Sequence, residues 1–405
     1  MAFGISHVRI RGFRSARDVS FAPGSLSALV GEANVGKSSL LAALRALLDP
    51  SAPPLLQEDA TVGGDGRIRI EALLEGGRTV VLEAMPPQSP NVDRREAPAA
   101  LFLPAALRAG ALVEPSATGA PATALVLELF QHALAERGGV PRPGTSATAP
   151  ARSLVSGLEA CCIRGVSGVV LLVEEPELYL TPQAQRYLYR LLRTFASHGN
   201  QVVYSTHAPA FLNVGRLEEL LVVSHRGPHG TTVHQPKPLP DDEAFRIVSE
   251  FDAERSELFL AHAAVLVEGR TEKLVFPFVF QALGHDADRE AISIVECGGK
   301  SNIPVFAGIC LAVGVPFLAV HDRDAEAGKE PIPAERAVND LILHVAGGDR
   351  TVVLEPDFEA VTGLVGRSSK PKRAWELFVS LPAAEVPEPL ALVAERALAL
   401  ARGGG

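Results

Sequence analysis

Apolar and polar residues follow patterns near the start of the chain that predict two strands and a helix. The segment HVRIRGF (7–13) alternates residue by residue, as expected for a strand with one buried face, and SLSALVG (25–31) is an apolar run that ends in glycine. SSLLAALRALL (38–48) then has apolar residues at helical spacing. These patterns place the glycine-containing segment 31–36 between a buried strand and a helix.

Further along, the pattern predicts a hairpin over 67–85 that turns at a Gly-Gly pair, and an amphipathic helix over 123–139 that stops at glycine. Two stretches rich in proline and in small or polar residues, 86–98 and 141–150, are predicted to be loops or linkers. The predicted helix therefore lies between two breaks in the regular pattern.

Two buried strands are predicted after the second loop. GVVLLVEEPELYL (168–180) is a continuous apolar run that ends in acidic residues, which is typical of a parallel sheet covered on both faces. A helix follows, and then a second apolar strand, NQVVYSTHAP (200–209). Together with the first half of the chain, these elements predict an α/β domain.

The pattern starts again in the last third of the chain. Three apolar strands, AAVLVEGRTE (263–272), AISIVECGGKSN (291–302) and PFLAVHDRD (316–324), each deliver polar residues at the carboxyl end, and helical segments separate them. A second, smaller α/β domain with a parallel sheet is predicted. The proposed domains are residues 1–258 and 259–405.

Composition supports two folded domains. The 405 residues are 47% hydrophobic and 21% charged, which is enough to bury two cores. The formal net charge of −9 argues against a globally basic nucleic-acid coat, but it leaves room for a local basic groove. It also suits a protein that collects divalent cations.

The opening segment and the cysteines give no sign of export or of a zinc site. MAFGISHVRIRGFRS has no apolar signal core, and the longest apolar stretch, 308–320, is too short to span a bilayer and contains Pro316. We therefore expect a soluble, cytoplasmic protein without membrane contact. The four cysteines form no CxxC pair, so we expect buried, reduced thiols.

Residues 31–38, GEANVGKS, match the phosphate-binding loop GxxxxGK[ST] at every fixed position. Backbone amides of such a loop surround the phosphates of a nucleotide, its lysine reaches the outer phosphates, and its serine hydroxyl binds Mg²⁺. The position between a predicted strand and a predicted helix is the context that the motif requires. We expect ATP with Mg²⁺, held by Gly31, Asn34, Gly36, Lys37, Ser38 and Ser39.

Acidic residues at the tip of the strand in 168–180 extend this site. Glu174 is expected to hold magnesium, directly or through water, and Glu175 to activate the attacking water. His207, at the tip of the next strand, is expected to sense the γ-phosphate. The alternative for the two acids is a solvated strand end, and the alternative for the histidine is a structural role.

Two pairs of acids occur at strand ends in the second domain. Glu268 and Glu272 are four residues apart, so a helix that starts between them brings both near one site. Asp322 and Asp324 alternate at the end of a later strand. Because four carboxylates at strand tips repel one another unless cations neutralise them, the pattern predicts a divalent-metal site. Surface charge is the alternative for either pair alone.

Four segments of the first domain resemble the ABC-type ATPase of the OLD (overcoming lysogenisation defect) nuclease family: HVRIRGFRSARDVSF, GEANVGKSSLLAAL, VEEPELYLTPQAQR and QVVYSTHAPAFL. ATPases of the RecF and SMC kind share the general pattern. Such domains usually work as pairs, in which a Ser-Gly signature segment of one copy completes the site of the other. The resemblance thus implies at least a homodimer, and it assigns Ser156 and Gly157, within SLVSGLEA, to the nucleotide site.

The second domain resembles a Toprim domain, with a glutamate on its first strand and DxD on a later one. The segments CGGKSNIPVF, LEPDFE and KPK are similar to the OLD-family version, so the resemblance covers nearly the whole chain. It implies that Mg²⁺, Mn²⁺ or Ca²⁺ is bound by Glu268, Glu272, Asp322, Asp324 and either Glu326 or Glu359. Glu268 and Asp322 would also act in catalysis. A lysine would stabilise the charged transition state; we favour Lys372, and Lys370 and Arg373 are the alternatives.

The resemblance implies an ATP-hydrolysing, metal-dependent DNA endonuclease that uses two metal ions, in phage defence or DNA processing. DNA is the expected partner, and a helicase is a second candidate partner. Two other functions stay open. A non-catalytic ATP-dependent clamp or scaffold of the RecF/SMC kind would leave the acids structural. A Toprim topoisomerase needs a tyrosine nucleophile, and all four tyrosines lie in the ATPase half.

Overall fold

The computed structural model describes residues 4–86, 90–94, 97–104, 121–137, 148–238, 255–325, 330–364 and 370–403. The chain divides into two compact units, 1–238 and 239–405. The boundary predicted after residue 258 lies beyond residues 239–254, which are outside the described residues, so it stays a prediction. The first unit contains two sheets and the second contains one, and each unit has its own buried apolar cluster.

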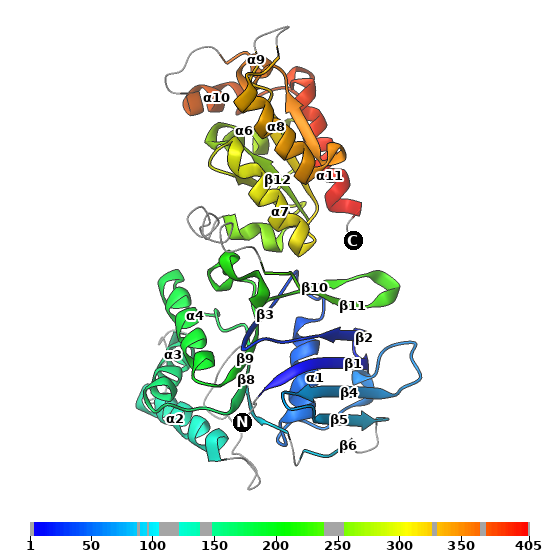
Figure 1. The fold of residues 1–405 in the computed structure, drawn as a ribbon, viewed down its shortest axis with the longest axis vertical. Coiled ribbons are helices and arrows are strands. Elements are labelled where there is room, and N and C mark those ends of the chain that lie inside the picture. The colour runs from blue at the N-terminus through cyan, green and yellow to red at the C-terminus, as the bar shows by residue number, and fades with distance from the viewer. Residues whose placement is uncertain are drawn as a thin grey trace. The chain divides into compact units, whose positions relative to one another are not determined.

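The first unit contains two sheets (Figure 1). One is antiparallel with the order β2-β1-β4-β5-β6, and its strands are β1 (Ile5–Phe13), β2 (Ala16–Phe21), β4 (Ile68–Leu74), β5 (Thr79–Ala84) and β6 (Asn91–Val92). The other has the order β11-β10-β3-β9-β8-β7 and is parallel except for the β10–β11 pair. Its strands are β3 (Leu26–Val30), β7 (Ala99–Leu103), β8 (Val169–Glu174), β9 (Gln201–Ser205), β10 (Leu220–His225) and β11 (Thr231–His234).

Helices cover both faces of the mostly parallel sheet. Figure 1 shows one helix between the two sheets and three others together on the opposite side of β8 and β9. The first is α1 (Lys37–Leu48), and the other three are α2 (Pro121–Arg137), α3 (Thr148–Ile163) and α4 (Pro182–Ser197). This layering explains why β8 and β9 are apolar at nearly every position, because neither face of these strands meets water.

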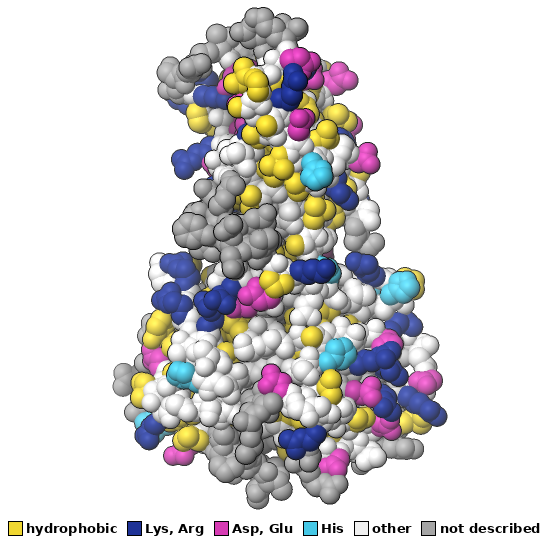
Figure 2. All heavy atoms as spheres, viewed as in Figure 1, with side chains coloured by type: hydrophobic (Ala, Val, Ile, Leu, Met, Phe, Trp, Pro, Cys, Tyr) yellow, Lys and Arg dark blue, Asp and Glu magenta, His cyan; other side chains and the backbone are white. Residues whose placement is uncertain are grey.

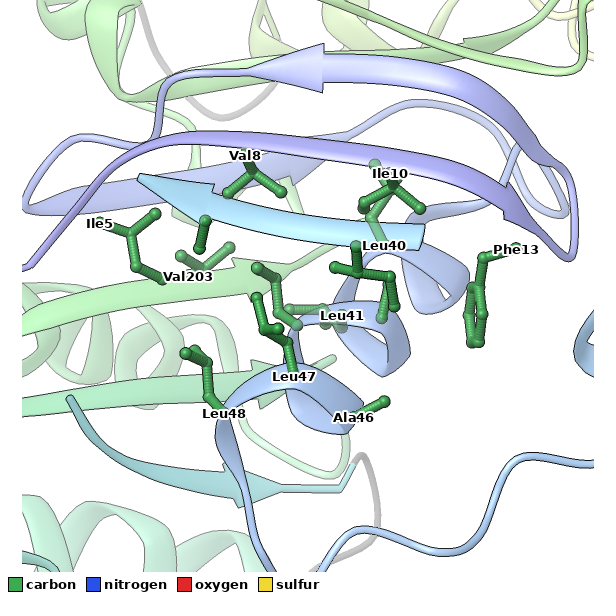
Figure 3. Packing of buried hydrophobic residues seen from close by; sticks show 14 of the residues in the cluster. Ile5, Val8, Ile10, Phe13, Leu40, Leu41, Ala46, Leu47, Leu48 and Val203 are labelled. Carbon is green, nitrogen blue, oxygen red and sulfur yellow. The ribbon is translucent and has the colours of Figure 1, made fainter. Parts of the chain in front are cut away.

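Helix α1 is apolar around most of its circumference because it packs against both sheets. Leu40, Leu41 and Leu47 are fully buried, and Figure 3 shows them among side chains from β1 and β9. The neighbours labelled there on the two strands are Ile5, Val8, Ile10, Phe13 and Val203. The residue that follows the glycine-rich loop is therefore fixed at the start of a helix that is held on two sides.

Leu41→Ala is expected to destabilise the first unit by about 2–5 kcal/mol, because it removes a fully buried side chain and leaves a cavity between the sheets. The measurement is the shift of the chemical unfolding midpoint. Leu56→Ala is the matched control, since Leu56 is 53% exposed and its truncation should change stability little. Equal effects of the two substitutions would contradict the packing of α1 described above.

The second unit has one parallel sheet with the order β13-β12-β14-β15. Its strands are β12 (Ala263–Val267), β13 (Ile292–Glu296), β14 (Phe317–Asp322) and β15 (Thr351–Leu354). The helices are α6 (Arg270–Ala282), α7 (Ile303–Val313), α8 (Pro333–Ala346), α9 (Phe358–Thr362), α10 (Lys370–Phe378) and α11 (Glu388–Gly403). Helices α6 and α11 pack on the sheet with α10 against α6, while α7 and α8 pack together and contact β12, β14 and β15.

Most of the sequence-predicted elements are confirmed, and two expectations need correction. The hairpin over 67–85 is the β4–β5 pair, and the helix over 123–139 is α2. The segment 86–98 is not loop throughout, because β6 pairs with β5. Of the loop predicted over 141–150, residues 141–147 lie outside the described residues and the last three begin α3.

None of the helices in the described part of the chain is long and apolar enough to cross a membrane. All four cysteines are free thiols, as expected. Cys161, Cys297 and Cys310 are buried, and Cys162 is partly buried. Burial raises the pKa of Cys161 to about 12, which keeps this thiol protonated and unreactive at neutral pH.

Candidate functional sites

The loop over residues 31–36 connects β3 to α1 and has the backbone of a phosphate-binding loop. Gly31 and Gly36 have φ values of 143° and 109°, a region that favours glycine, and Asn34 is also left-handed. Steric crowding also requires glycine at positions 31 and 36. A Cβ on Gly31 would lie 2.1 Å from the Val223 carbonyl oxygen, and one on Gly36 would lie 2.2 Å from Thr231 Oγ1. The two glycines therefore let the loop pass close to β10 and β11.

Lys37, the first residue of α1, points back into this loop. Its side chain is buried, and its ammonium group donates hydrogen bonds to the carbonyl oxygens of Gly31 (2.8 Å) and Glu32. Burial lowers the pKa of Lys37 to about 8, while the nearby Glu175 and Glu177 favour its charged form. The loop thus holds a cation beside backbone amides, an arrangement suited to phosphate oxygens.

The carboxyl ends of β8 and β9 bring Glu175 and His207 together. These strands are neighbours in the sheet, and Glu175 Oε1 lies 3.8 Å from His207 Nε2. Strand β8 ends at Glu174, and the backbone of the next residue, Glu175, is left-handed with φ 44°, so Glu175 does not continue the extended strand. Burial and the charge of Lys37 lower the pKa of His207 and favour its neutral form. The two residues thus lie at one sheet edge with Lys37 in electrostatic reach.

Glu177 is a residue of this site that the sequence analysis did not select. It is buried, and its carboxylate accepts a hydrogen bond of 2.6 Å from the backbone N–H of His207. Burial raises the pKa of Glu177. The signal in the sequence was a third acid, two residues after Glu175, in an otherwise apolar segment. Glu177 ties the loop after β8 to the loop after β9, and so helps to fix Glu175 beside His207.

Ser156 and Gly157 lie in the second half of helix α3. A Cβ on Gly157 would come within 2.6 Å of the Phe130 ring of α2, so glycine is needed there for the two helices to approach closely. This packing accounts for Gly157 without a nucleotide. A role for the pair as a signature segment stays a prediction.

In the second unit, an open pocket of about 860 Å³ lies at the carboxyl edge of the sheet. Helix α6 begins two residues after Glu268, which places both Glu268 and Glu272 at its wall, as the spacing predicted. The acidic and basic side chains that line it include Glu268, Glu272, Asp322, Asp324, Glu359 and Lys370. Acids from β12, β14 and α9 therefore meet in one place.

Hydrogen bonds connect the acids of neighbouring strands. Glu268 Oε1 accepts from the backbone N–H of Asp322 at 2.8 Å, and Asp322 Oδ1 accepts from the N–H of Phe358 at 2.8 Å. Burial, together with the charges of neighbouring acids, raises the pKa of Glu268 to about 7 and that of Asp322 to about 8. Burial also raises the pKa of Glu272. Burial thus favours the neutral form of these carboxyl groups, and a nearby positive charge would favour the ionised form.

Lysines accompany two of the acids. Lys370 forms an ion pair with Glu359 in the pocket, and Lys300 forms one with Asp324 at 2.8 Å. Lys372, which the sequence analysis favoured, is 75% exposed and pairs with Glu376 instead. The reason is helical phase: Lys370 is one turn from the buried Ala374, whereas Lys372 points away from the core. The structure therefore places Lys370, and not Lys372, at the acidic pocket.

The last predicted metal ligand, Glu326, lies outside the described residues. Within the described part of the chain, no three acidic, histidine or cysteine side chains are set closely enough to form a ready metal-ligand group.

Family models match three parts of the chain. Residues 259–324 match the overcoming lysogenization defect protein-like TOPRIM domain, residues 154–212 match an AAA ATPase domain, and residues 4–56 match a family of unknown function. The chain is 33% identical over 273 residues to the OLD nuclease of Thermus scotoductus, which covers 60% of this chain and 52% of that protein.

Both units of the chain are similar to OLD-family proteins.

A second relative is the Old nuclease of Escherichia phage P2, which is 27% identical over 165 residues, covering 39% of this chain and 28% of that protein. The chain thus spans about half or less of these relatives. The C-terminal region of the Xanthomonas campestris pv. campestris OLD protein superposes with a TM-score of 0.29 at 16% identity, covering 36% of this chain and 100% of that one. The SMC head domain from Thermotoga maritima superposes with a TM-score of 0.38 at 14% identity, covering 58% of this chain and 99% of that one.

The expected α/β fold class is confirmed. A unit that matches an AAA ATPase domain precedes a smaller unit that matches a TOPRIM domain, and the sheet of the second unit is parallel throughout its described strands. The roles of the individual site residues are not tested by these likenesses. They stay predictions.

Proposed function

We propose that this chain is an OLD-like nuclease that binds and hydrolyses ATP in its first unit and cleaves DNA phosphodiesters, with the help of divalent cations, in its second. One observation supports the second activity most strongly: Glu268 and Asp322, from adjacent strands, are joined by a hydrogen bond and face one open pocket with Glu272. The two relatives described above are named as nucleases.

The donors in this pocket fit a hard divalent cation. Mg²⁺ and Mn²⁺ prefer carboxylate oxygens, and Glu268, Glu272 and Asp322 would hold such an ion. A bound ion would offset the negative charge of a phosphodiester and lower the pKa of a bound water. The backbone N–H groups of Asp322 and Phe358 hold two of the three carboxylates in fixed directions, which prepares them for one ligand position.

Lys370 is the residue we assign to stabilise charge on the phosphate. It lines the pocket, and its ion pair with Glu359 holds the ammonium near the acids. An ammonium group beside the reacting phosphate stabilises the negative charge that grows on its oxygens in the transition state. Lys372 has no such position, because it pairs with Glu376 on the exposed side of α10.

The first unit has the parts for ATP hydrolysis. The loop 31–36 offers backbone N–H groups, Lys37 would contact the outer phosphates, and Ser38 with Glu174 would hold Mg²⁺. Glu175 would take a proton from the attacking water, and its neighbour His207, whose backbone is held by Glu177, would contact the γ-phosphate.

Family likeness alone supports the finer parts of this proposal. These are the use of two metal ions, assembly as a homodimer with Ser156 and Gly157 completing a partner's nucleotide site, a helicase partner, and a role in phage defence. The rival function is an ATP-dependent clamp or scaffold in which the acidic pocket does no chemistry.

Incubation of the full chain with supercoiled plasmid tests the proposal against this rival. We expect nicked and linear products with Mg²⁺ or Mn²⁺, and none when EDTA is added, because removing the ion leaves the carboxylates without the charge that activates water. A clamp would retain the plasmid in an ATP-dependent complex and leave it uncut under every ion condition. That result would overturn the nuclease assignment.

A further inference from the structure

Lys300 is a buried cation at the edge of the acidic pocket, and the motif analysis gave it no role. It begins the short 3₁₀ turn that follows β13, and it is only 8% exposed. Its ammonium nitrogen lies 2.8 Å from Asp324 Oδ2 and 3.3 Å from Glu335 Oε2. The lysine therefore joins the loop after β13 to the loop after β14 and to the first turn of α8.

The backbone fixes both partners of the Lys300–Asp324 pair. Gly298 and Gly299 have φ values of 74° and 135°, which lets the chain turn sharply before Lys300, and the Gly299 N–H donates to the Glu268 carbonyl oxygen at 2.8 Å. Asp324 is left-handed with φ 54°, and its N–H donates to the Pro356 carbonyl oxygen at 3.0 Å. A non-glycine residue in this region stores some strain, so the position of its carboxylate is held by the surrounding structure.

The acids of the pocket therefore divide into two groups. Glu268 and Asp322 accept hydrogen bonds from neutral backbone N–H groups and form no ion pair with a described residue, so Lys300 and Lys370 act on them only from a longer distance. Asp324 instead has a full positive charge within 2.8 Å, on a side chain that is itself buried. A lysine in such a place is favourable only while its carboxylate partners remain, since an unpaired buried ammonium is costly.

We propose that Lys300 takes the position of a second cation, so that the pocket binds one divalent ion, at Glu268, Glu272 and Asp322, and not the two expected from the sequence. Asp324 is then a positioning residue that holds the ammonium and is not a metal ligand. The inference rests on the function proposed above. Its consequence is that part of the positive charge of the site is permanent and independent of the free metal concentration.

The test counts the Mn²⁺ ions that the nucleotide-free full chain binds, by equilibrium dialysis or by electron paramagnetic resonance of the free ion. The ions of the acidic pocket are those that disappear in Asp322→Ala. We expect one such ion in the wild type, and we expect Lys300→Met to bind one ion more in total than the wild type, because methionine fills the same space and leaves Asp324 and Glu335 free to bind a cation. Lys300→Arg, which keeps the charge, should bind the same total as the wild type.

Asp324→Asn in the wild-type background gives a second, independent measurement if Lys300→Met does not fold. We expect its ion count to equal that of the wild type, because Asp324 already has its cation. A wild type that binds two ions and loses one in Asp324→Asn would overturn the inference and leave the nuclease proposal standing. So would a folded Lys300→Met that binds no more ions than the wild type. Absence of any ion that depends on Asp322 would instead overturn the metal site proposed above.

Discussion

Asp322→Ala is expected to reduce metal-dependent DNA cleavage by about a hundredfold or more, the size seen when one preorganised transition-state stabiliser is removed. Asp322 lies at the end of β14, where its own N–H binds Glu268 and its Oδ1 binds the N–H of Phe358. Removal of this carboxylate takes one ligand from the proposed ion and the acceptor from the Phe358 N–H, while the backbone N–H that donates to Glu268 remains. ATP turnover should stay close to wild type, because Lys37, Glu174 and Glu175 belong to the other unit.

The measurement is a plasmid-nicking assay beside a phosphate-release assay on the same preparation. Asp322→Asn separates charge from hydrogen bonding, since the amide oxygen can still accept from Phe358 but the negative charge is gone; it should lose cleavage too. Glu376→Gln is the matched control, because Glu376 is an exposed acid of the same unit that pairs with Lys372. Full cleavage by Asp322→Ala would remove this pocket as the nuclease site.

The fold could be predicted largely because its strands are short and apolar and end in polar residues. Strands β8, β9, β12, β13 and β14 were all visible in this way. Strands β6 and β7 were not, because β6 has two residues and β7 follows a proline-rich stretch. Strand β6 forms by pairing with β5, and strand β7 forms by pairing with β8. Pairing with another strand leaves no local pattern from which either strand could be predicted.

The acidic pocket was predictable from motif spacing, but its lysines were not. Lys300 gains its partners Asp324 and Glu335 only when α8 packs beside the ends of β13 and β14, and those residues are 24 and 35 positions away. The choice between Lys370 and Lys372 depends on which face of α10 is buried. Ala374 and Phe378 set that face, and a residue four positions before Ala374 lies on it while a residue two positions before it does not.

Glu177 is a site residue that the sequence alone did not identify. The sequence shows three acids within four residues, Glu174, Glu175 and Glu177, and the motif assigned roles to the first two but none to Glu177. The left-handed backbone at Glu175 turns its neighbours to different sides, and Glu177 becomes a buried acceptor for the His207 N–H. The burial of Glu177 thus comes with its contact to the loop after β9, which a local sequence pattern does not show.

Lys37→Ala is expected to weaken ATP binding by about tenfold to a hundredfold or more, because charge-assisted hydrogen bonds to phosphate contribute roughly 1.5–3 kcal/mol. Lys37 is 5% exposed and sits at the first turn of α1 with its ammonium against the carbonyl oxygens of the loop. Methionine at this position would keep the aliphatic stem, so Lys37→Met tests the charge alone and should lose affinity to the same extent.

The measurement is the affinity for a fluorescent ATP analogue with Mg²⁺, followed by anisotropy. Lys237→Ala is the matched control, since Lys237 is an exposed lysine of the same unit and should leave the affinity unchanged. Metal-dependent nicking by Lys37→Met in the absence of ATP should match the wild type, because the acidic pocket belongs to the other unit. Unchanged nucleotide affinity in both Lys37 variants would mean that the loop 31–38 does not hold the phosphates, and the ATPase assignment of the first unit would fail with it.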